Sequence, residues 1–175
     1  MVDPLAFRRV VGRFPTGVTV ITTVSAGEHH ALTCSSFTSV SLDPVLVLFG
    51  VEKRARFHDV VLATGTWAVS VLAQGQEDLS RQFAVRGRPL EDQFVGVPFA
   101  PGPVTGAPVL DGAVAALECR TTSTVDAGDH TLVLGEVLGL SLPEPSAEPL
   151  LYVEGRYAAL GDAPDGAQAA SRPTG

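Results

Sequence analysis

A run of hydroxyl side chains is the densest group of hydrogen-bonding residues in the sequence. Residues 33–41 read TCSSFTSVS, so six of these nine positions are Ser or Thr. Hydroxyls and the N–H groups between them suit a polar ligand such as a ribityl chain or phosphate oxygens. The same pattern is typical of an edge strand with one solvated face. The residues alone leave both interpretations open.

Cationic side chains gather in a second segment, where a helix is expected to begin. Lys53, Arg54 and Arg56 lie within four residues of a chain that is acidic overall. Cations beside the unpaired N–H groups of a helix N-terminus form an anion site that can hold a phosphate. A solvated surface cluster is the alternative. A smaller basic group flanks the next expected helix and consists of Arg81, Arg86 and Arg88.

Two further sets of side chains could act on a ring-shaped ligand. His130 follows Gly128 and Asp129 at the head of a predicted strand, where a histidine can exchange a proton near neutral pH. Asp129 could orient the ring, although a histidine in a turn is more often only solvated. The second set, Tyr152, Arg156 and Tyr157, could present a planar, cationic surface, or could pack as an ordinary C-terminal hairpin.

The common metal and nucleotide fingerprints are absent from the sequence. His29 and His30 are adjacent, so on a strand they point to opposite faces and cannot chelate one metal. Cys34 and Cys119 are far apart and form no metal-ligand spacing, which favours two buried free thiols. There is no P-loop, GxGxxG, GxSxG or HExxH. We predict no metal site, and any nucleotide cofactor must be held in another way.

Composition limits the class of protein that must position these residues. The 175 residues are 45% hydrophobic and carry a formal net charge of -7, which indicates one globular domain and disfavours a sequence-blind nucleic-acid binder. The N-terminus lacks the apolar core of a secretory signal. The longest apolar run, residues 45–51, is far shorter than the roughly 20 residues that span a membrane. We therefore expect a cytoplasmic protein with no membrane or nucleic-acid partner.

Hydrophobic periodicity predicts a mainly β protein with a few short helices. Helices are expected at 4–11, with Asp3 as N-cap, at 55–63, ended by Gly65, and at 76–84. Strands are expected at 17–24, 30–36, 45–51, 66–72, 113–125, 131–140, 150–153 and 156–160. The apolar run 45–51 should be a central strand covered on both faces. These strands favour a closed barrel for residues 1–161, and the polar tail 162–175 is expected to be disordered.

Taken in order, several motifs resemble the flavin reductase-like domain family, the NAD(P)H:flavin oxidoreductase components of two-component flavin-dependent monooxygenases. The first half of the chain carries FRRVVGRFPTGVTVIT (7–22), TCSSFTSVSLDP (33–44), WAVSVL (67–72) and LSRQFA (79–84). The second half carries VLDG (109–112), ALEC (116–119), GDH (128–130) and GRY (155–157). Each motif is loose by itself, but the order and spacing of the set are specific.

The resemblance implies a split β-barrel of the Greek-key, FMN-binding type, in a homodimer with the flavin near the interface. It implies FAD or FMN as the flavin, NADH as the reductant with NADPH as the alternative, and a monooxygenase partner that receives reduced flavin by diffusion. By position, Thr16 and Val18 should line the isoalloxazine region. The ring edge and ribityl-phosphate should meet Thr33, Cys34, Ser35, Ser36 and Ser39.

The remaining implied contacts concern the phosphate and the second ring. The phosphate should lie near the segment that contains Val51, Lys53, Arg54, Ala55, Arg56 and Phe57, and Phe83 should lie beside the flavin. His130 is the candidate catalytic residue on the nicotinamide side, with Tyr152, Arg156 and Tyr157 near it. The alternatives are a non-catalytic flavin- or haem-binding split barrel, and a pyridoxine-phosphate-oxidase-like enzyme, for which no substrate-phosphate clamp is identified.

Overall fold

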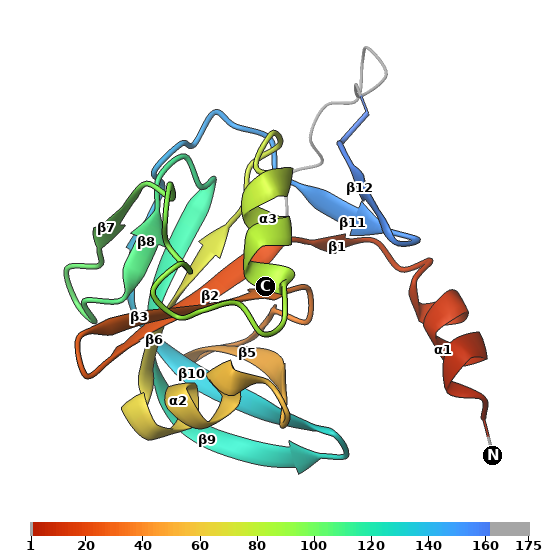
Figure 1. Ribbon diagram of the computed structural model, residues 1–175, viewed down its shortest axis with the longest axis horizontal. Coiled ribbons are helices and arrows are strands. Elements are labelled where there is room, and N and C mark those ends of the chain that lie inside the picture. Colours follow the sequence, from red (N-terminus) through yellow and green to blue (C-terminus); the bar gives the residue numbers. More distant parts are fainter. Residues whose placement is uncertain (1, 162–175) are drawn as a thin grey trace.

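The computed structural model describes residues 2–161 (Figure 1). Its helices are α1 (Pro4–Val11), α2 (Arg56–Thr64) and α3 (Glu77–Ala84), close to the predicted segments. Asp3 caps α1 as predicted, because its carboxylate accepts the N–H groups of Leu5 and Ala6 at 3.2 and 3.1 Å. None of these three helices is long and apolar enough to cross a bilayer. The predicted disorder of 162–175 concerns residues outside the described range.

Strands contain far more of the described chain than helices do, so the mainly β prediction is confirmed. The first six strands are β1 (Thr16–Gly17), β2 (Thr19–Ser25), β3 (Glu28–Cys34), β4 (Thr38–Leu42), β5 (Val45–Glu52) and β6 (Thr66–Val71). The other six are β7 (Phe99–Pro101), β8 (Pro108–Leu110), β9 (Ala115–Ala127), β10 (His130–Ser141), β11 (Leu151–Val153) and β12 (Arg156–Ala158). The principal sheet has the order β3-β2-β6-β9-β10-β5-β4. Smaller sheets join β1-β11-β12 and β7-β8.

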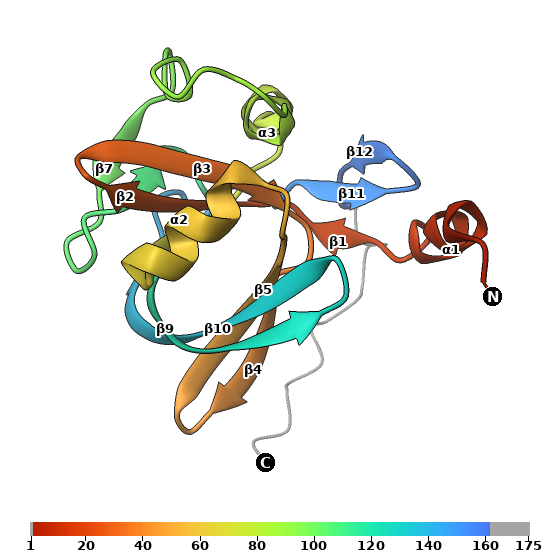
Figure 2. The same cartoon turned by 60° about the horizontal axis from the view of Figure 1, so that its bottom comes forward.

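The principal sheet curls into a barrel that is split on one side (Figure 2). Strand pairing does not close the circle, because β3 and β4 remain its two edges within the described residues. A side chain bridges the gap instead: Ser36 Oγ accepts the N–H of Gly50 at 3.0 Å and donates to the Gly50 carbonyl at 3.2 Å. A closed barrel was therefore not the right expectation, while the split barrel implied by the family resemblance is confirmed.

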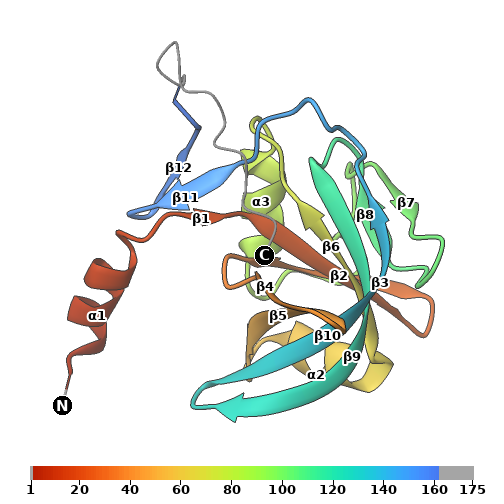
Figure 3. The same cartoon turned by 180° about the vertical axis from the view of Figure 1, so that it is seen from behind.

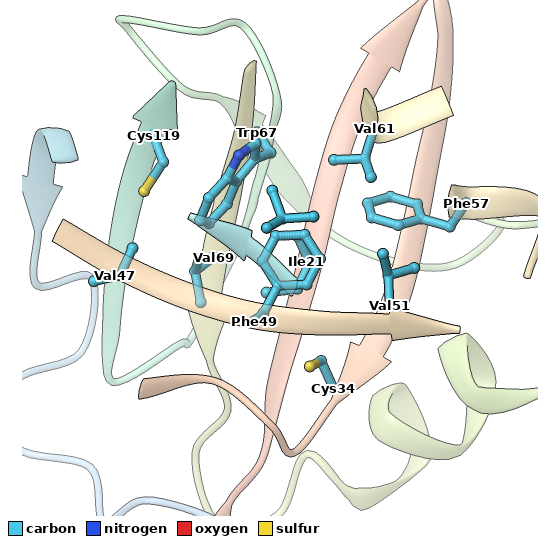
Figure 4. Packing of buried hydrophobic residues seen from close by; sticks show 11 residues of the cluster. Ile21, Cys34, Val47, Phe49, Val51, Phe57, Val61, Trp67, Val69 and Cys119 are labelled. Carbon is cyan, nitrogen blue, oxygen red and sulfur yellow. The ribbon is translucent and has the colours of Figure 1, made fainter. Parts of the chain in front are cut away.

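The barrel interior is filled by one of two hydrophobic clusters (Figure 4). Phe49 and Trp67 are fully buried and meet edge to face, with ring centroids 4.8 Å apart, and Phe57 and Val61 bring α2 onto this cluster. Burial of one such side chain stabilises a fold by about 1.5–3 kcal/mol. The second cluster packs α3 against β2 and the segment that follows α3.

Strand β5 differs from its prediction in one respect. Val47, Phe49 and Val51 are buried, whereas Val45 is 46% exposed and the residues between them are only half-buried. β5 lies between β10 and β4 as an interior strand, but one face packs on the core and the other is partly solvated. Coverage on both faces was wrong because the sheet is antiparallel, and antiparallel strands need only one buried face.

The long segment after α3 folds back onto the barrel through an aromatic cluster. Phe94 meets Phe83 of α3 with ring centroids 5.1 Å apart, and it also meets Phe99 at 5.1 Å. His29 of β3 lies edge-on to Phe94 and Phe99, at 5.5 and 4.9 Å. This packing fixes residues 85–97 beside the exposed edge of β3.

Candidate active site

The split in the barrel opens into a cleft of about 520 Å³. Its walls come from β3, the end of β5, the start of α2 and the C-terminal end of α3 with the residues that follow. Ten of the residues predicted from the sequence line it: Thr33, Cys34, Ser35, Ser36, Arg54, Ala55, Arg56, Phe57, Phe83 and His130. Segments that lie far apart in the sequence therefore converge on one concave site.

The hydroxyl-rich wall is held in place by its own side chains. Thr33 Oγ1 donates to the carbonyl of Ser80 at 2.7 Å and so ties β3 to α3. Cys34 Sγ lies 3.1 Å from Ser36 Oγ, and burial raises the pKa of the Cys34 thiol, which keeps it protonated. The edge-strand interpretation also holds, but further along: β4 is an edge of the sheet and most of its residues are exposed. The hydroxyl segment thus supplies a cleft wall first and an edge strand afterwards.

Cations occupy the opposite side of the cleft. Helix α2 begins at Arg56 with no side-chain cap; the N–H of His58 donates to the Ala55 carbonyl at 2.9 Å, which leaves the N–H groups of Arg56 and Phe57 for a ligand. Arg56 Nη1 donates to the carbonyl of Arg88 at 2.8 Å, and Arg54 is exposed. Arg86 pairs with Glu52, and both of these residues line the cleft. These groups give that side a net positive charge suited to an anionic ligand.

Lys53 lies outside this cationic group. Its ammonium donates to Asp126 Oδ2 at 2.7 Å and to the Gly128 carbonyl at 2.8 Å, in the turn between β9 and β10. The three cations expected to lie together are therefore separated after the end of β5. Arg54 and Arg56 line the cleft, and Lys53 binds the turn between β9 and β10. A direct phosphate contact by Lys53 stays a prediction.

His130 opens β10 at the rim of the cleft. Its Nδ1 lies 2.7 Å from Asp129 Oδ1, and its side chain is 45% exposed. The hydrogen bond and charge of His130 lower the pKa of the Asp129 carboxyl. Asp129 therefore orients the ring, as its position in the sequence suggested, and leaves Nε2 without a protein partner among the described residues.

The other predicted residues lie away from the cleft. Val18 and Val51 are buried in the two hydrophobic clusters, and Ser39 is exposed on β4, opposite Val47. Thr16 pairs with Tyr152 between β1 and β11, and its hydroxyl is buried without a partner. Their contacts with a cofactor remain predictions.

The tyrosine pair lines a second, shallower hollow on the other side of α3, with Arg156, Glu77, Asp78 and Arg81. Tyr157 donates to Ser80 Oγ at 2.9 Å or accepts from it, and the guanidinium of Arg81 lies 4.9 Å from the Tyr157 ring centroid. Tyr152 and Tyr157 meet at 5.4 Å. Within one chain this hollow does not join the cleft, so the nicotinamide-side role of Tyr152, Arg156 and Tyr157 stays untested.

Sequence reasoning missed several cleft residues: His30, Glu52, Gln82, Arg86 and Gln93 line the walls but were not assigned to the site. His30 was considered only as a metal ligand, yet the alternation of a strand already indicated that one of His29 and His30 faces inward. Gln93 carried no such signal, because it belongs to an irregular segment.

Comparison with known proteins identifies the class. Residues 11–161 match the model of the flavin reductase like domain, and the chain belongs to this family. It is 47% identical over 161 residues to an NADH-dependent FAD reductase of Streptomyces globisporus, covering 90% of this chain and 87% of the relative. It is 39% identical over 160 residues to HsaB, the reductase subunit of a flavin-dependent monooxygenase of Mycobacterium tuberculosis. This match covers 91% of this chain and 83% of HsaB.

A solved structure has the same fold. The NADH:FAD oxidoreductase SgcE6 of Streptomyces globisporus, in complex with NAD and FAD fragments, superimposes with a TM-score of 0.86 and is 45% identical. The match covers 95% of this chain and 98% of that one. The fold and the family expected from the sequence are both confirmed.

Proposed function

We propose that residues 1–161 form an NADH-dependent flavin reductase that reduces FAD or FMN and supplies the reduced flavin to a partner monooxygenase. The observation that carries this proposal is the cleft at the split of the barrel, where a hydroxyl-rich wall faces a cationic side. Membership of the flavin reductase like family gives the reaction class.

The residues of the cleft fit a flavin nucleotide. The hydroxyl of Ser35, the backbone around it, and the remaining acceptor capacity of the Thr33 and Ser36 oxygens suit the polar edge of the ring and the ribityl chain. Arg54, Arg56 and the uncapped start of α2 suit the phosphate. The flavin itself supplies the redox chemistry, by accepting a hydride from the nicotinamide.

The protein contributes position and electrostatics rather than a covalent step. Two rings must lie close together in the right orientation, and such positioning can supply a large part of a rate enhancement. His130, oriented by Asp129 at the rim, is placed to hold the nicotinamide-bearing substrate or to exchange a proton through Nε2. Single hydroxyls rather than several bidentate arginine clamps suit a flavin that must leave after reduction.

Steady-state assays of the purified protein test the proposal. NADH oxidation, followed at 340 nm, should require added FAD or FMN and should exceed the rate without protein. The same assay with NADPH measures the preference for the reductant, and anaerobic transfer to an oxygenase measures delivery of reduced flavin. NADH oxidation no faster than the protein-free control would refute the function.

We further propose that the protein is a homodimer and is cytoplasmic. The apolar side chains of α1 have no cover among residues 2–161, since the helix buries none of its residues, and it projects from the barrel (Figure 3). Leu5, Phe7 and Val10 are 64%, 58% and 72% exposed, which supports burial against a second copy. The free thiols Cys34 and Cys119 support a reducing compartment.

A further inference from the structure

Two polar side chains on the β3 side of the cleft are buried and have hydrogen-bonding groups that no protein atom satisfies. His30 and Gln93 both line the cleft and are only 7% and 8% exposed. Their side-chain nitrogens without a protein partner are accessible where the two residues line the cleft, so a bound ligand can use them as hydrogen-bonding groups. Neither residue was used in the function proposed above.

The orientation of Gln93 is fixed by a neighbouring backbone group. β3 is an edge strand, and the outward N–H of Ala31 donates to Gln93 Oε1 at 2.9 Å. Only the amide oxygen can accept that hydrogen bond, so the assignment of oxygen and nitrogen is unambiguous. The NH2 group of Gln93 therefore has no partner among residues 2–161 and is available as a donor.

Gln93 is also held from its other side. Gln82 of α3 donates to the Gln93 carbonyl at 3.2 Å and to the Val95 carbonyl at 3.3 Å. The aromatic contact of Phe94 with Phe83 adds a second anchor next to it. The backbone of Gln93 is thus held by Gln82 and its side chain by the Ala31 N–H, and a group that is already positioned loses less rotamer entropy when a ligand binds.

His30 precedes Ala31, the residue that holds Gln93, and both His30 and Gln93 line the cleft. Burial, and then the charge of Arg56, lower the pKa of His30; Glu28 acts in the opposite direction, and His29 adds to the lowering. The imidazole is therefore neutral near pH 7, and a neutral imidazole has one donor and one acceptor nitrogen. Together the pair offers an amide N–H donor and an imidazole acceptor.

We propose that His30 and Gln93 form an uncharged subsite that binds an amide-like edge, a carbonyl next to an N–H, on one of the two ring systems of the reaction. Gln93 donates to the carbonyl and His30 accepts from the N–H. Two ligands carry this chemistry: the carboxamide of the nicotinamide and the pyrimidine edge of the flavin. The proposal rests on the proposed function, because that function brings both ligands to the cleft.

Isosteric variants test the subsite without removing its structural contact. In Gln93→Glu, one carboxylate oxygen still accepts the Ala31 N–H, but the free donor becomes an acceptor. His30→Phe keeps an aromatic ring and removes both nitrogens, while His30→Gln keeps an uncharged donor and acceptor. The matched controls are Gln74→Glu, at an exposed position, and His29→Phe, which retains the contacts with Phe94 and Phe99.

Two measurements separate the two ligands: the Kd of oxidised FAD and FMN from fluorescence quenching, and the KM of NADH. Gln93→Glu and His30→Phe should each weaken the same ligand by about tenfold or more, whereas His30→Gln and both controls should stay within about twofold of wild type. A change in flavin Kd assigns the pyrimidine edge, and a change in NADH KM alone assigns the carboxamide.

Failure of the subsite is distinguishable from failure of the function. Wild-type protein that reduces flavin, with both variants folded and unchanged in flavin Kd and NADH KM, overturns the subsite alone. Variants that affect different ligands also overturn it, because one subsite binds one edge. Thermal unfolding of each variant verifies the fold, and His30→Phe decides the question if Gln93→Glu is unstable.

Discussion

Two histidines of the cleft have different surroundings, and these decide what each ring can do. His30 is buried beside Arg56, and both effects favour the neutral imidazole. His130 lies at the rim, and its Nδ1–H donates to the exposed carboxylate of Asp129. A buried neutral ring suits recognition of a fixed ligand edge, whereas an exposed, oriented ring suits exchange with substrate and solvent.

Replacement of His130 by Ala should slow hydride transfer without removing the flavin. We expect kcat/KM for NADH to fall about tenfold, because the orienting contact at the rim is lost, and the flavin Kd to change by less than twofold. Stopped-flow reduction of bound flavin measures the effect. Wild-type kinetics in the variant would remove His130 from the mechanism.

The burial of neutral His30 makes stability depend on pH. Its pKa in the folded state is lower than the value of 6.5 in the unfolded chain, so the unfolded chain binds more protons below pH 6.5. The free energy of unfolding should therefore decrease as pH falls from about 6.5 through the lowered pKa, by at most about 1.4 kcal/mol per pH unit. Urea titrations of the wild type and His30→Phe measure it. An equal pH dependence in both proteins would contradict this assignment.

At the scale of the residue, the sequence predicted which hydrogen-bonding and charged groups a ligand needs. It did not predict which of these residues line the cleft and which lie outside it. The hydroxyls of residues 33–36 and Arg54 and Arg56 reach one cleft as expected. Lys53, adjacent in the sequence, pairs with Asp126 instead, because a strand end sends successive side chains to different sides. Gln93 could not be predicted, since its place depends on a hydrogen bond to a strand 62 residues away.

At the scale of the element, the buried carboxylate of Glu118 on β9 organises the loop between β7 and β8. Glu118 is 5% exposed. Its Oε2 accepts the N–H groups of Val104 and Thr105 at 3.0 and 2.6 Å, and the Thr105 hydroxyl at 2.8 Å. Three donors to one carboxylate oxygen replace the water that burial removes.

Removal of this carboxylate should destabilise the fold. We expect Glu118→Ala to lower the free energy of unfolding by about 2–4 kcal/mol, because the loop donors lose their acceptor in a buried place. The matched control is Glu136→Ala, whose carboxylate pairs with Arg120 at 2.8 Å on the exposed surface, where an ion pair contributes about 0–1 kcal/mol. Chemical denaturation compares the two. Equal losses would show that the Glu118 contacts contribute no more than a surface pair.

Helices whose ends are marked by capping residues were predicted well. Short strands that depend on pairing with another strand were not predicted. The N-cap Asp3 and the left-handed Gly65 mark the ends of α1 and α2 within one residue of the prediction. β1, β7 and β8 are two or three residues long, too short for a hydrophobic period. They exist because other strands pair with them.

At the scale of the whole molecule, α1 is the part of the chain least explained by a single copy. We expect the double variant Phe7→Glu/Val10→Glu to convert the proposed dimer into monomers, because two charges cannot be buried in an apolar interface without partners. Light scattering after size exclusion measures the mass. Val95→Glu, also at an exposed apolar position, is the control and should stay dimeric. A monomeric wild-type protein, or a dimeric double variant, would contradict the interface.

The split of the barrel was the large-scale feature that hydrophobic periodicity could not predict. Periodicity distinguishes buried from exposed faces, and both a closed and an open barrel satisfy it. In the split barrel β3 and β4 stay unpaired edges, and Ser36, which follows β3, contacts Gly50 of β5 through its hydroxyl. The motifs of the family carried this information, and the local pattern did not.

The protonated thiol of Cys34 has a consequence for the working lifetime of the molecule. A flavin that is reduced in the proposed site and meets dioxygen before it leaves yields hydrogen peroxide in the cleft whose wall contains this sulfur. Peroxide oxidises thiolates, and a buried thiol with a raised pKa offers almost none. Cys34 can thus survive many turnovers beside a source of oxidant, where an ionised cysteine would be converted to sulfenic acid.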